Sequence, residues 1–293
     1  KPEKTSGFCT DVFFDNAMRF IESNKDRPFF FYLPTNVPHN PINIEAEYSK
    51  PYLKKGLGEE LADFYGSITR IDQNVGRLLD LVKSLGLEED TIMIFLTDNG
   101  TAGSGSNCGM RGKKGTEYDG GHRVPCFIRW PRGLLGAGCD VDTLTAHIDL
   151  LPTLIDLCGL AKPPDVQFDG RSLSPLLGGR TGTWSSRMLF VQVGRTDFLE
   201  KWARFAVMTE QWRLVNSTEL YDIEIDPGQT NNVADMHPQI VKQLRCEYER
   251  WWKDVSRRFD EYCHVVIGDK DSGEALLTLM DWHGPGGQRT ACS

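Results

Sequence analysis

Residues 91–100 read Thr-Ile-Met-Ile-Phe-Leu-Thr-Asp-Asn-Gly, a short apolar run that ends in an acid, an amide and a glycine. A continuous apolar run of this length is typical of a strand buried on both faces of a parallel sheet. The segment before it, residues 58–85, repeats apolar side chains at helical spacing and predicts a long helix that ends near Gly86. A helix followed by a buried strand, with polar residues at the end of the strand, indicates an α/β domain.

The same alternation occurs earlier in the chain. Residues 10–24 carry apolar side chains at helical spacing, and residues 28–33, Pro-Phe-Phe-Phe-Tyr-Leu, predict a second buried strand. Helix, strand, helix and strand in succession favour a doubly wound domain with a mostly parallel sheet. We further expect a strand at residues 127–130 and a helix at residues 150–157, with Asp149 as its N-terminal cap.

The pattern changes in the stretch 163–187, which is rich in glycine, proline and serine. Beyond it, short apolar segments lie close together and predict an antiparallel sheet followed by a helix at residues 238–256. The four predicted strands are residues 188–193, 204–209, 212–216 and 219–223. We therefore expect two domains, residues 1–180 and residues 181–293.

The composition excludes several classes of protein. The chain has 33 Lys and Arg against 41 Asp and Glu, a net charge of −8, which argues against general binding to nucleic acid or to anionic membranes. No apolar run approaches the roughly 18 residues of a membrane-spanning helix. The 8 cysteines form no C-x-x-C pair, so a zinc or thioredoxin-like site is disfavoured, and ordinary thiols are favoured over a disulfide framework.

Asp98 and Asn99 are the first candidates for chemistry. They come directly after an expected strand, and open α/β sheets place their sites at such strand ends. A carboxylate beside an amide oxygen suits Ca²⁺ or Mg²⁺, because both cations prefer oxygen ligands. Asp-Asn-Gly is also a common turn, so a purely structural interpretation stays open.

Two other segments carry groups that could meet an anionic substrate. His39 lies between two prolines after the expected strand at residues 28–33, on a stiff backbone suited to proton donation or anion contact. Lys113 and Lys114 lie in the glycine-rich loop 100–124, where glycine lets the backbone approach an anion and lysine supplies positive charge. The alternatives are a surface histidine and a solvated charged turn. The spacing of a P-loop is absent.

The order of the segments is more specific than any one of them. Residues 38–41 (Pro-His-Asn-Pro), 96–100 (Leu-Thr-Asp-Asn-Gly), 111–125 (Arg-Gly-Lys-Lys-Gly-Thr through His-Arg-Val-Pro), 147–153 (His-Ile-Asp-Leu-Leu-Pro-Thr) and 219–228 (Glu-Leu-Tyr-Asp through Asp-Pro-Gly) follow one another. This order resembles the second half of the formylglycine-dependent sulfatases of the alkaline phosphatase superfamily, over nearly the whole chain. The tail, residues 259–284, resembles the end of a subset of bacterial members. The resemblance implies an alkaline-phosphatase-like α/β sandwich plus a small antiparallel subdomain with a helix.

The resemblance also assigns roles to individual residues. Asp98 and Asn99 match the divalent-metal ligands of the family, usually for Ca²⁺, with Mg²⁺ as the other choice. His39 matches a histidine that contacts the sulfate ester and helps protonate the leaving oxygen. Lys114 matches a lysine that binds the sulfate and the leaving oxygen, with Lys113 as the alternative register. The implied activity is sulfuric ester hydrolysis on a sulfated small molecule or glycan, and family habit favours a periplasmic or secreted location.

The sequence departs from the family at the nucleophile. Members carry a cysteine in a C-x-P-x-R-type motif that matures to formylglycine, and no cysteine of this chain has that context. The family's paired aspartates and catalytic arginine are also absent. We therefore expect the C-terminal part of a longer sulfatase, inactive alone, whose N-terminal part carries the formylglycine and is its partner. Asp98 and Asn99 offer at most about three oxygens, against about six to eight around Ca²⁺, so weak metal binding by this chain alone is expected.

Two other functions stay open from the sequence. The absence of the nucleophile favours a non-catalytic remnant that binds a sulfated glycan or a partner chain. The same fold also suits a hydrolase of phosphomonoesters or phosphonates within the superfamily. The lysine-containing glycine loop and the tail favour sulfate over these esters.

Overall fold

The computed structural model describes residues 4–133, 138–180, 182, 184–194, 200–259, 266–267 and 277–278. The chain divides into two compact units, residues 1–187 and residues 188–293. This boundary lies a few residues beyond the one expected from the sequence. Most of the tail at residues 259–284 lies outside the described residues.

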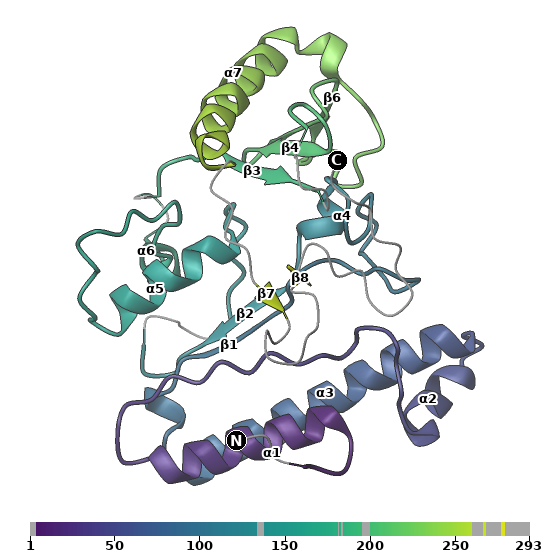
Figure 1. The fold of residues 1–293 in the computed structure, drawn as a ribbon, viewed down its shortest axis with the longest axis vertical. Helices are drawn as coiled ribbons and strands as arrows, with labels where there is room; N and C mark the ends of the chain where they lie inside the picture. The colour runs from purple at the N-terminus through teal and green to yellow at the C-terminus, as the bar shows by residue number, and fades with distance from the viewer. Residues whose placement is uncertain are drawn as a thin grey trace. The chain divides into compact units, whose positions relative to one another are not determined.

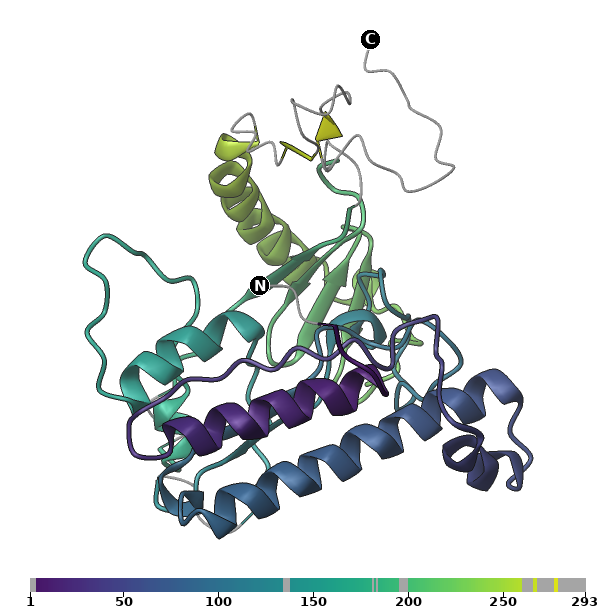
Figure 2. The same ribbon diagram turned by 60° about the horizontal axis from the view of Figure 1, so that its bottom comes forward.

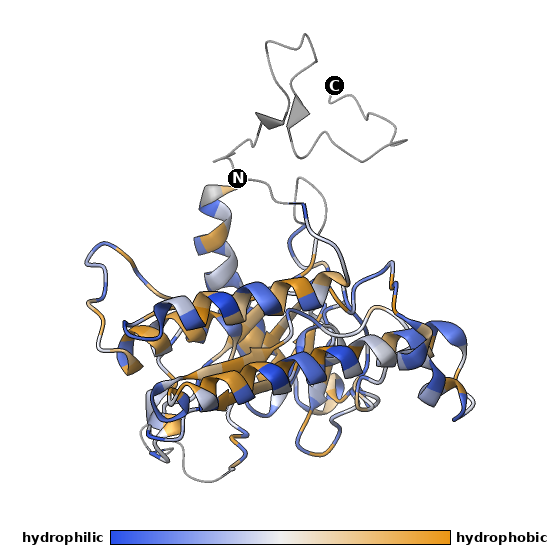
Figure 3. Cartoon of the chain, turned by 90° about the horizontal axis from the view of Figure 1, so that it is seen from below, coloured by the Kyte–Doolittle hydropathy of each residue, from blue (hydrophilic) through white to orange (hydrophobic). Residues whose placement is uncertain are grey.

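Three helices open the first unit: α1 (Cys9–Asn24), α2 (Ala46–Leu53) and α3 (Glu59–Ser84). Figures 1 and 2 both show α1 lying along α3, and the two helices share an apolar cluster. The buried members of this cluster are Phe14, Ile21, Leu78 and Val82. Figure 3 shows polar and apolar residues alternating along both helices, as expected when only one face is buried. Both helices match the sequence prediction, and α2, which contains Pro51, was not predicted.

The apolar segment at residues 28–33 differs from its prediction. It has no strand partner among the described residues, although Phe29 and Leu33 pack against the cluster between α1 and α3. The alternate side chains Phe30 and Tyr32 are 72% and 76% exposed. The prediction of a strand buried on both faces is therefore wrong, because described polypeptide covers only one side of the segment.

The second apolar segment forms β1 (Met93–Leu96), which pairs antiparallel with β2 (Cys126–Arg129). Phe95 lies opposite Phe127, and their ring centroids are 6.3 Å apart. All strand pairs within the described residues are antiparallel, so the mostly parallel sheet expected from the apolar runs is not seen there. The expected α/β class is confirmed by the helices and strands of this unit.

Short elements complete the first unit. They are η1 (Glu88–Asp90), α4 (Asp119–His122), η2 (His147–Asp149), α5 (Leu150–Leu157) and α6 (Ser174–Leu177). Asp149 precedes α5 as predicted, but its carboxylate makes no capping hydrogen bond to that helix. It accepts instead from the backbone N–H groups of Ala146 and Arg171 at 2.7 and 2.8 Å, and it pairs with Arg187. The expected helix cap is therefore a buried junction between three segments.

The second unit is a four-stranded antiparallel sheet packed against one helix, as predicted. The strands are β3 (Leu189–Gln192), β4 (Phe205–Met208), β5 (Trp212–Val215) and β6 (Glu219–Asp222), in the order β3-β4-β5-β6. The short η4 (Ala234–Met236) leads into α7 (Pro238–Val255), and η5 (Ser256–Arg258) follows it. The buried core consists of Phe205, Val207, Leu214, Leu220, Val233, Leu244 and Tyr248. A further strand pair, β7 (Val266–Ile267) and β8 (Leu277–Thr278), is antiparallel.

Two findings bear on the classes excluded by composition. Within the described residues, none of the helices has both the length and the apolar character needed to cross a membrane. The six cysteines in the described part of the chain are free thiols.

Candidate functional site

The turn at residues 97–100 leaves the carboxyl end of β1 and carries Asp98 and Asn99. The backbone N–H of Gly100 donates to the carbonyl of Gly121 in α4 at 3.0 Å. A Cβ on Gly100 would lie 2.0 Å from the carbonyl oxygen of Gly120, so only glycine fits this approach. The turn is therefore fixed against the backbone of the glycine-rich loop.

The glycine-rich loop brings Lys114 to the same turn. The backbone N–H of Lys114 donates to the carbonyl of Thr101 at 2.9 Å, two residues beyond Asn99. Gly112 and Gly115 flank the lysine pair with φ of +86° and +80°, in the left-handed region that favours glycine. The structure thus places the backbone of Lys114 beside the turn that carries Asp98 and Asn99, and the assembly of their side chains into one site stays a prediction.

Burial distinguishes the two lysines of the loop. Lys114 is half-buried, whereas Lys113 is exposed. The loop segment that holds them is closed by Thr116, whose hydroxyl donates to the carbonyl of Lys113 at 2.8 Å. A half-buried ammonium interacts more strongly with a nearby anion than an exposed one, because water screens it less. This difference in residue burial makes Lys114 the better candidate of the two, and its role stays a prediction.

The donor chemistry at the turn suits a hard cation. Asp98 is exposed, and the Asn99 side-chain amide donates from Nδ2 to the carbonyl of Gly100 at 3.0 Å, which leaves Oδ1 as an acceptor. In the described part of the chain, no group of three or more His, Cys, Asp or Glu is placed to hold a metal ion. The two side chains therefore fit part of a Ca²⁺ or Mg²⁺ shell, and other groups would have to complete it.

His39 lies on the loop between α1 and α2. Its Nδ1 is 2.7 Å from the carbonyl oxygen of Asn40, and since a carbonyl only accepts, Nδ1 carries the proton. In the neutral ring Nε2 is then the acceptor. Among the described residues, no hydrogen bond joins His39 to the turn at 97–100 or to Lys114. Its membership of the site stays a prediction.

Sequence reasoning missed a residue beside the turn. The imidazole Nε2 of His147, in η2, is 2.8 Å from the carbonyl oxygen of Thr97, the residue before Asp98. Fifty positions separate the two residues, so no local pattern connects them. The available signal was the place of His147 within the ordered motif at residues 147–153.

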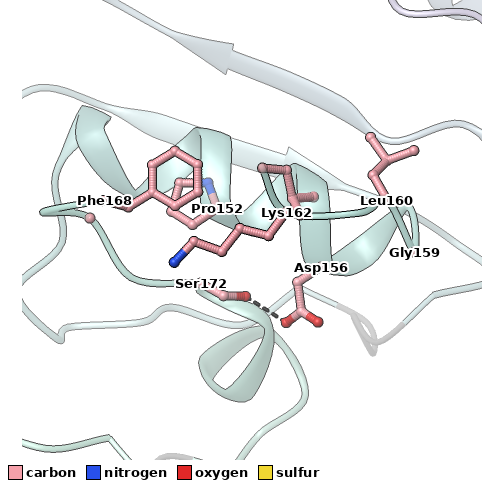
Figure 4. A pocket seen from close by; sticks show the side chains of 9 residues that line it. Pro152, Asp156, Gly159, Leu160, Lys162, Phe168 and Ser172 are labelled. Atoms are coloured by element: carbon pink, nitrogen blue, oxygen red, sulfur yellow. Dashed lines mark hydrogen bonds between the residues drawn. The ribbon is translucent and has the colours of Figure 1, made fainter. Parts of the chain in front are cut away.

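A separate hollow of about 540 Å³ lies beside α5 (Figure 4). Asp156 accepts a hydrogen bond from the hydroxyl of Ser172 at 2.7 Å within it. Lys162 Nζ lies 5.0 Å from the ring centroid of Phe168. None of the predicted site residues lines this hollow, so it is distinct from the turn that carries Asp98.

The comparisons with known proteins give the family. Residues 1–160 match the Sulfatase family, and residues 112–254 match the C-terminal region of N-sulphoglucosamine sulphohydrolase. The chain is 32% identical over 241 residues to the N-acetylgalactosamine-6-sulfatase of Canis lupus familiaris, covering 78% of this chain and 44% of that protein. It is 32% identical over 256 residues to arylsulfatase A of Homo sapiens, covering 75% of this chain and 48% of that protein. The chain spans about half the length of the curated relatives it matches.

A solved structure supports the fold. The crystal structure of Ps i-CgsB in complex with k-i-k-neocarrahexaose superposes with a TM-score of 0.78 at 24% identity, covering 86% of this chain and 56% of that one. This likeness confirms the fold that the resemblance implied. Because the Sulfatase match covers more than half of the residues, the chain belongs to the sulfatase family.

Proposed function

We propose that this chain carries the cation-binding and leaving-group side of a sulfuric ester hydrolase that acts on sulfated carbohydrates. Membership of the sulfatase family supports the reaction class. The observation that carries the proposal is the hydrogen bond from the Lys114 backbone to Thr101, because it joins the lysine loop to the turn of Asp98 and Asn99. A cationic side chain and two oxygen ligands then flank one small region.

The residues of this chain have distinct tasks in the proposed reaction. Lys114 neutralises charge on the sulfuryl oxygens, a role that needs no bond making and depends on a fixed, partly desolvated ammonium. In its doubly protonated form His39 delivers the Nε2 proton to the leaving oxygen and becomes the neutral ring, and its bond from Nδ1 to Asn40 orients the ring for this task. Asp98 and Asn99 would hold Ca²⁺, or Mg²⁺, which when bound supplies further positive charge at the sulfuryl group.

The nucleophile is proposed to come from elsewhere. The 293 residues contain no C-x-P-x-R motif that could mature to formylglycine. We propose that polypeptide N-terminal to this chain supplies the formylglycine and the other cation ligands, and acts as its partner. We therefore expect the isolated chain to show no hydrolysis. Only binding of a cation or of a sulfated ligand could be measured with it.

The adjacent lysines provide a direct test. In the complete protein that contains this chain, Lys114→Gln is expected to lower kcat/KM for an aryl sulfate by about 10²- to 10³-fold, because a charged transition-state contact is lost. The matched control Lys113→Gln removes an exposed ammonium from the same loop and is expected to change kcat/KM by less than about threefold. A larger loss of kcat/KM in Lys113→Gln than in Lys114→Gln would show that Lys113, and not Lys114, has this role.

The other function classes predict different results in the same assay. Preference for an aryl phosphate or phosphonate over the sulfate would favour a phosphoester or phosphonate hydrolase. Binding of a sulfated oligosaccharide with no hydrolysis by the complete protein would favour a non-catalytic role. Either result would contradict the proposed sulfuric ester hydrolase.

A further inference from the structure

The contact between His147 and Thr97 joins two distant segments at the candidate site. The imidazole Nε2 lies 2.8 Å from the Thr97 carbonyl oxygen. A carbonyl oxygen has no proton to give, so Nε2 must donate in this bond. The bond therefore fixes the peptide that leads directly into Asp98.

The segment that carries His147 is itself firmly anchored. His147 begins η2, and Asp149 ends it. The Asp149 carboxylate accepts two hydrogen bonds from Arg187 Nη1, at 2.8 and 3.0 Å. The side chains of Asp149 and Arg187 are 0% and 3% exposed. The buried ion pair at one end of this turn therefore holds the backbone of η2 in place, and with it the position from which His147 extends.

The turn that carries the two predicted ligands is thus held from both ends. The glycine-rich loop holds its far end, through the bond from the Gly100 backbone to Gly121. His147 holds its near end, through the carbonyl of Thr97. Asp98 and Asn99 lie between these two points of attachment. Loss of the His147 bond would remove one attachment of the near end, while the pairing of Leu96 with Cys126 in the adjoining strands would remain.

We propose that His147 is a positioning residue for the cation site, which it serves by fixing the Thr97 peptide so that Asp98 and Asn99 present their oxygens in one arrangement. This inference rests on the proposed function. His147 contacts neither the cation nor the substrate in this role, because its Nε2 is engaged by Thr97. Groups that orient metal ligands typically affect metal affinity by about 10- to 100-fold, and an exposed histidine belongs at the low end of that range.

The test uses three variants of the complete protein that contains this chain. His147→Ala removes the donor, and His147→Gln keeps an N–H donor of similar reach. The matched control Ile148→Ala removes a half-exposed side chain from the same η2 turn without touching Thr97. Two properties are measured for each variant: Ca²⁺ affinity by titration calorimetry, and amide hydrogen exchange of residues 97–101 without added cation.

We expect His147→Ala to weaken Ca²⁺ binding by about tenfold and to speed amide exchange at residues 97–101. His147→Gln and Ile148→Ala should stay within about threefold of the unchanged protein in Ca²⁺ affinity. Unchanged Ca²⁺ affinity in His147→Ala would overturn the inference, whether or not the exchange rate rises. Failure of the unchanged protein to bind Ca²⁺ would instead overturn the cation site of the proposed function, and with it the task assigned to His147.

Discussion

Asp149 and Arg187 form an ion pair buried in the first unit. Their side chains are 0% and 3% exposed, and Arg187 Nη1 reaches both carboxylate oxygens. Such a pair contributes little net stability, because desolvation offsets much of the attraction. Removing one partner is a different matter, since the remaining group stays buried without its oppositely charged partner. The free energy of unfolding should therefore depend strongly on this single arginine.

We expect Arg187→Met to lower the free energy of unfolding by about 3–5 kcal/mol, because it leaves the Asp149 carboxylate unpaired. Urea denaturation followed by circular dichroism measures the change. The control is Arg132→Ala, which breaks an exposed pair with Asp90 at 2.7 Å and should cost about 0–1 kcal/mol. Equal losses in the free energy of unfolding for the two variants would contradict the prediction that breaking the buried pair is the more destabilising change.

At the scale of the elements, Arg70 of α3 ties three segments together. Its Nε donates to Asp11 of α1 at 3.1 Å, and it also pairs with Glu45 just before α2. The guanidinium carbon lies 4.2 Å from the ring centroid of Phe8 and 4.8 Å from that of Tyr48. The hydrogen bond from Arg70 holds the pKa of Asp11 below its ordinary value, and the same bond raises the pKa of Arg70.

This lowered pKa predicts a pH-dependent stability. A carboxylate whose pKa is lower in the folded chain stabilises the fold above its unfolded pKa of about 3.9, and the contribution is lost as pH falls through the folded value. Asp11→Asn should therefore lower the free energy of unfolding at pH 7 by on the order of 1 kcal/mol. Below the folded pKa the variant and the unchanged chain should converge. Denaturation curves at pH 7 and at a pH below the folded pKa of Asp11 check this. The same difference in free energy of unfolding at both pH values would contradict the prediction.

Tyr248 is one of two α7 side chains buried in the core that joins this helix to the sheet of the second unit. Tyr248 is 0% exposed, its hydroxyl donates to Gln192 at 2.9 Å, and it accepts from the backbone N–H of Trp202 at 3.3 Å. Burial raises the pKa of Tyr248, so the hydroxyl stays protonated at neutral pH.

We expect Tyr248→Phe to destabilise the second unit by about 1–3 kcal/mol, because the part-buried Gln192 and Trp202 groups lose their hydrogen-bond partner while the ring volume is kept. The matched control Tyr32→Phe removes a hydroxyl from a side chain that is 76% exposed, and should be neutral. Thermal unfolding measured for both variants tests the difference. A neutral Tyr248→Phe would show that water or a neighbouring group replaces the bond.

Across the whole molecule, the sequence predicted four of the helices well and missed α2, α4 and α6. The expected ranges for α1, α3, α5 and α7 agree with the structure to within a residue or two, because a helix that buries one face shows that face in its own sequence. The burial of residues 28–33 was predicted wrongly, since burial depends on neighbouring polypeptide and not on the run itself. For the same reason, the apolar run of β1 did not reveal that β2 pairs with it antiparallel.

In the candidate site too, residues in local motifs could be predicted, whereas a contact between distant segments could not. Asp98, Asn99 and Lys114 could be proposed from the sequence, because each lies in a short motif whose residue types carry the chemistry, and their roles stay predictions. His147 could not be assigned a role, since its bond to Thr97 spans fifty positions and uses a backbone carbonyl. Main-chain acceptors leave no trace in the identity of the residue that carries them.

Exposed aromatic side chains on the first unit predict that the isolated chain associates with itself in solution. Phe30, Tyr32 and Phe127 are 72%, 76% and 65% exposed, and exposed apolar side chains favour association. We expect the isolated chain to form dimers or larger species in analytical ultracentrifugation. Phe127→Glu should shift the distribution toward the monomer, because a charge opposes burial of that surface. Ile225→Glu, at an 80% exposed position in the other unit, is the control. A purely monomeric starting sample would contradict the prediction.

The close approach of Gly100 to Gly120 has a practical consequence for anyone who wishes to redesign this protein. Any side chain at position 100 would collide with a carbonyl oxygen 2.0 Å away, and one at position 120 would meet the carbonyls of Gly112 and Arg111 at 2.5 and 2.6 Å. Randomised libraries should leave both codons unchanged, since we expect most substitutions at these positions to cause misfolding. Lys113, in the same loop, is exposed, so we expect it to accept other side chains and to be the better place to begin a screen.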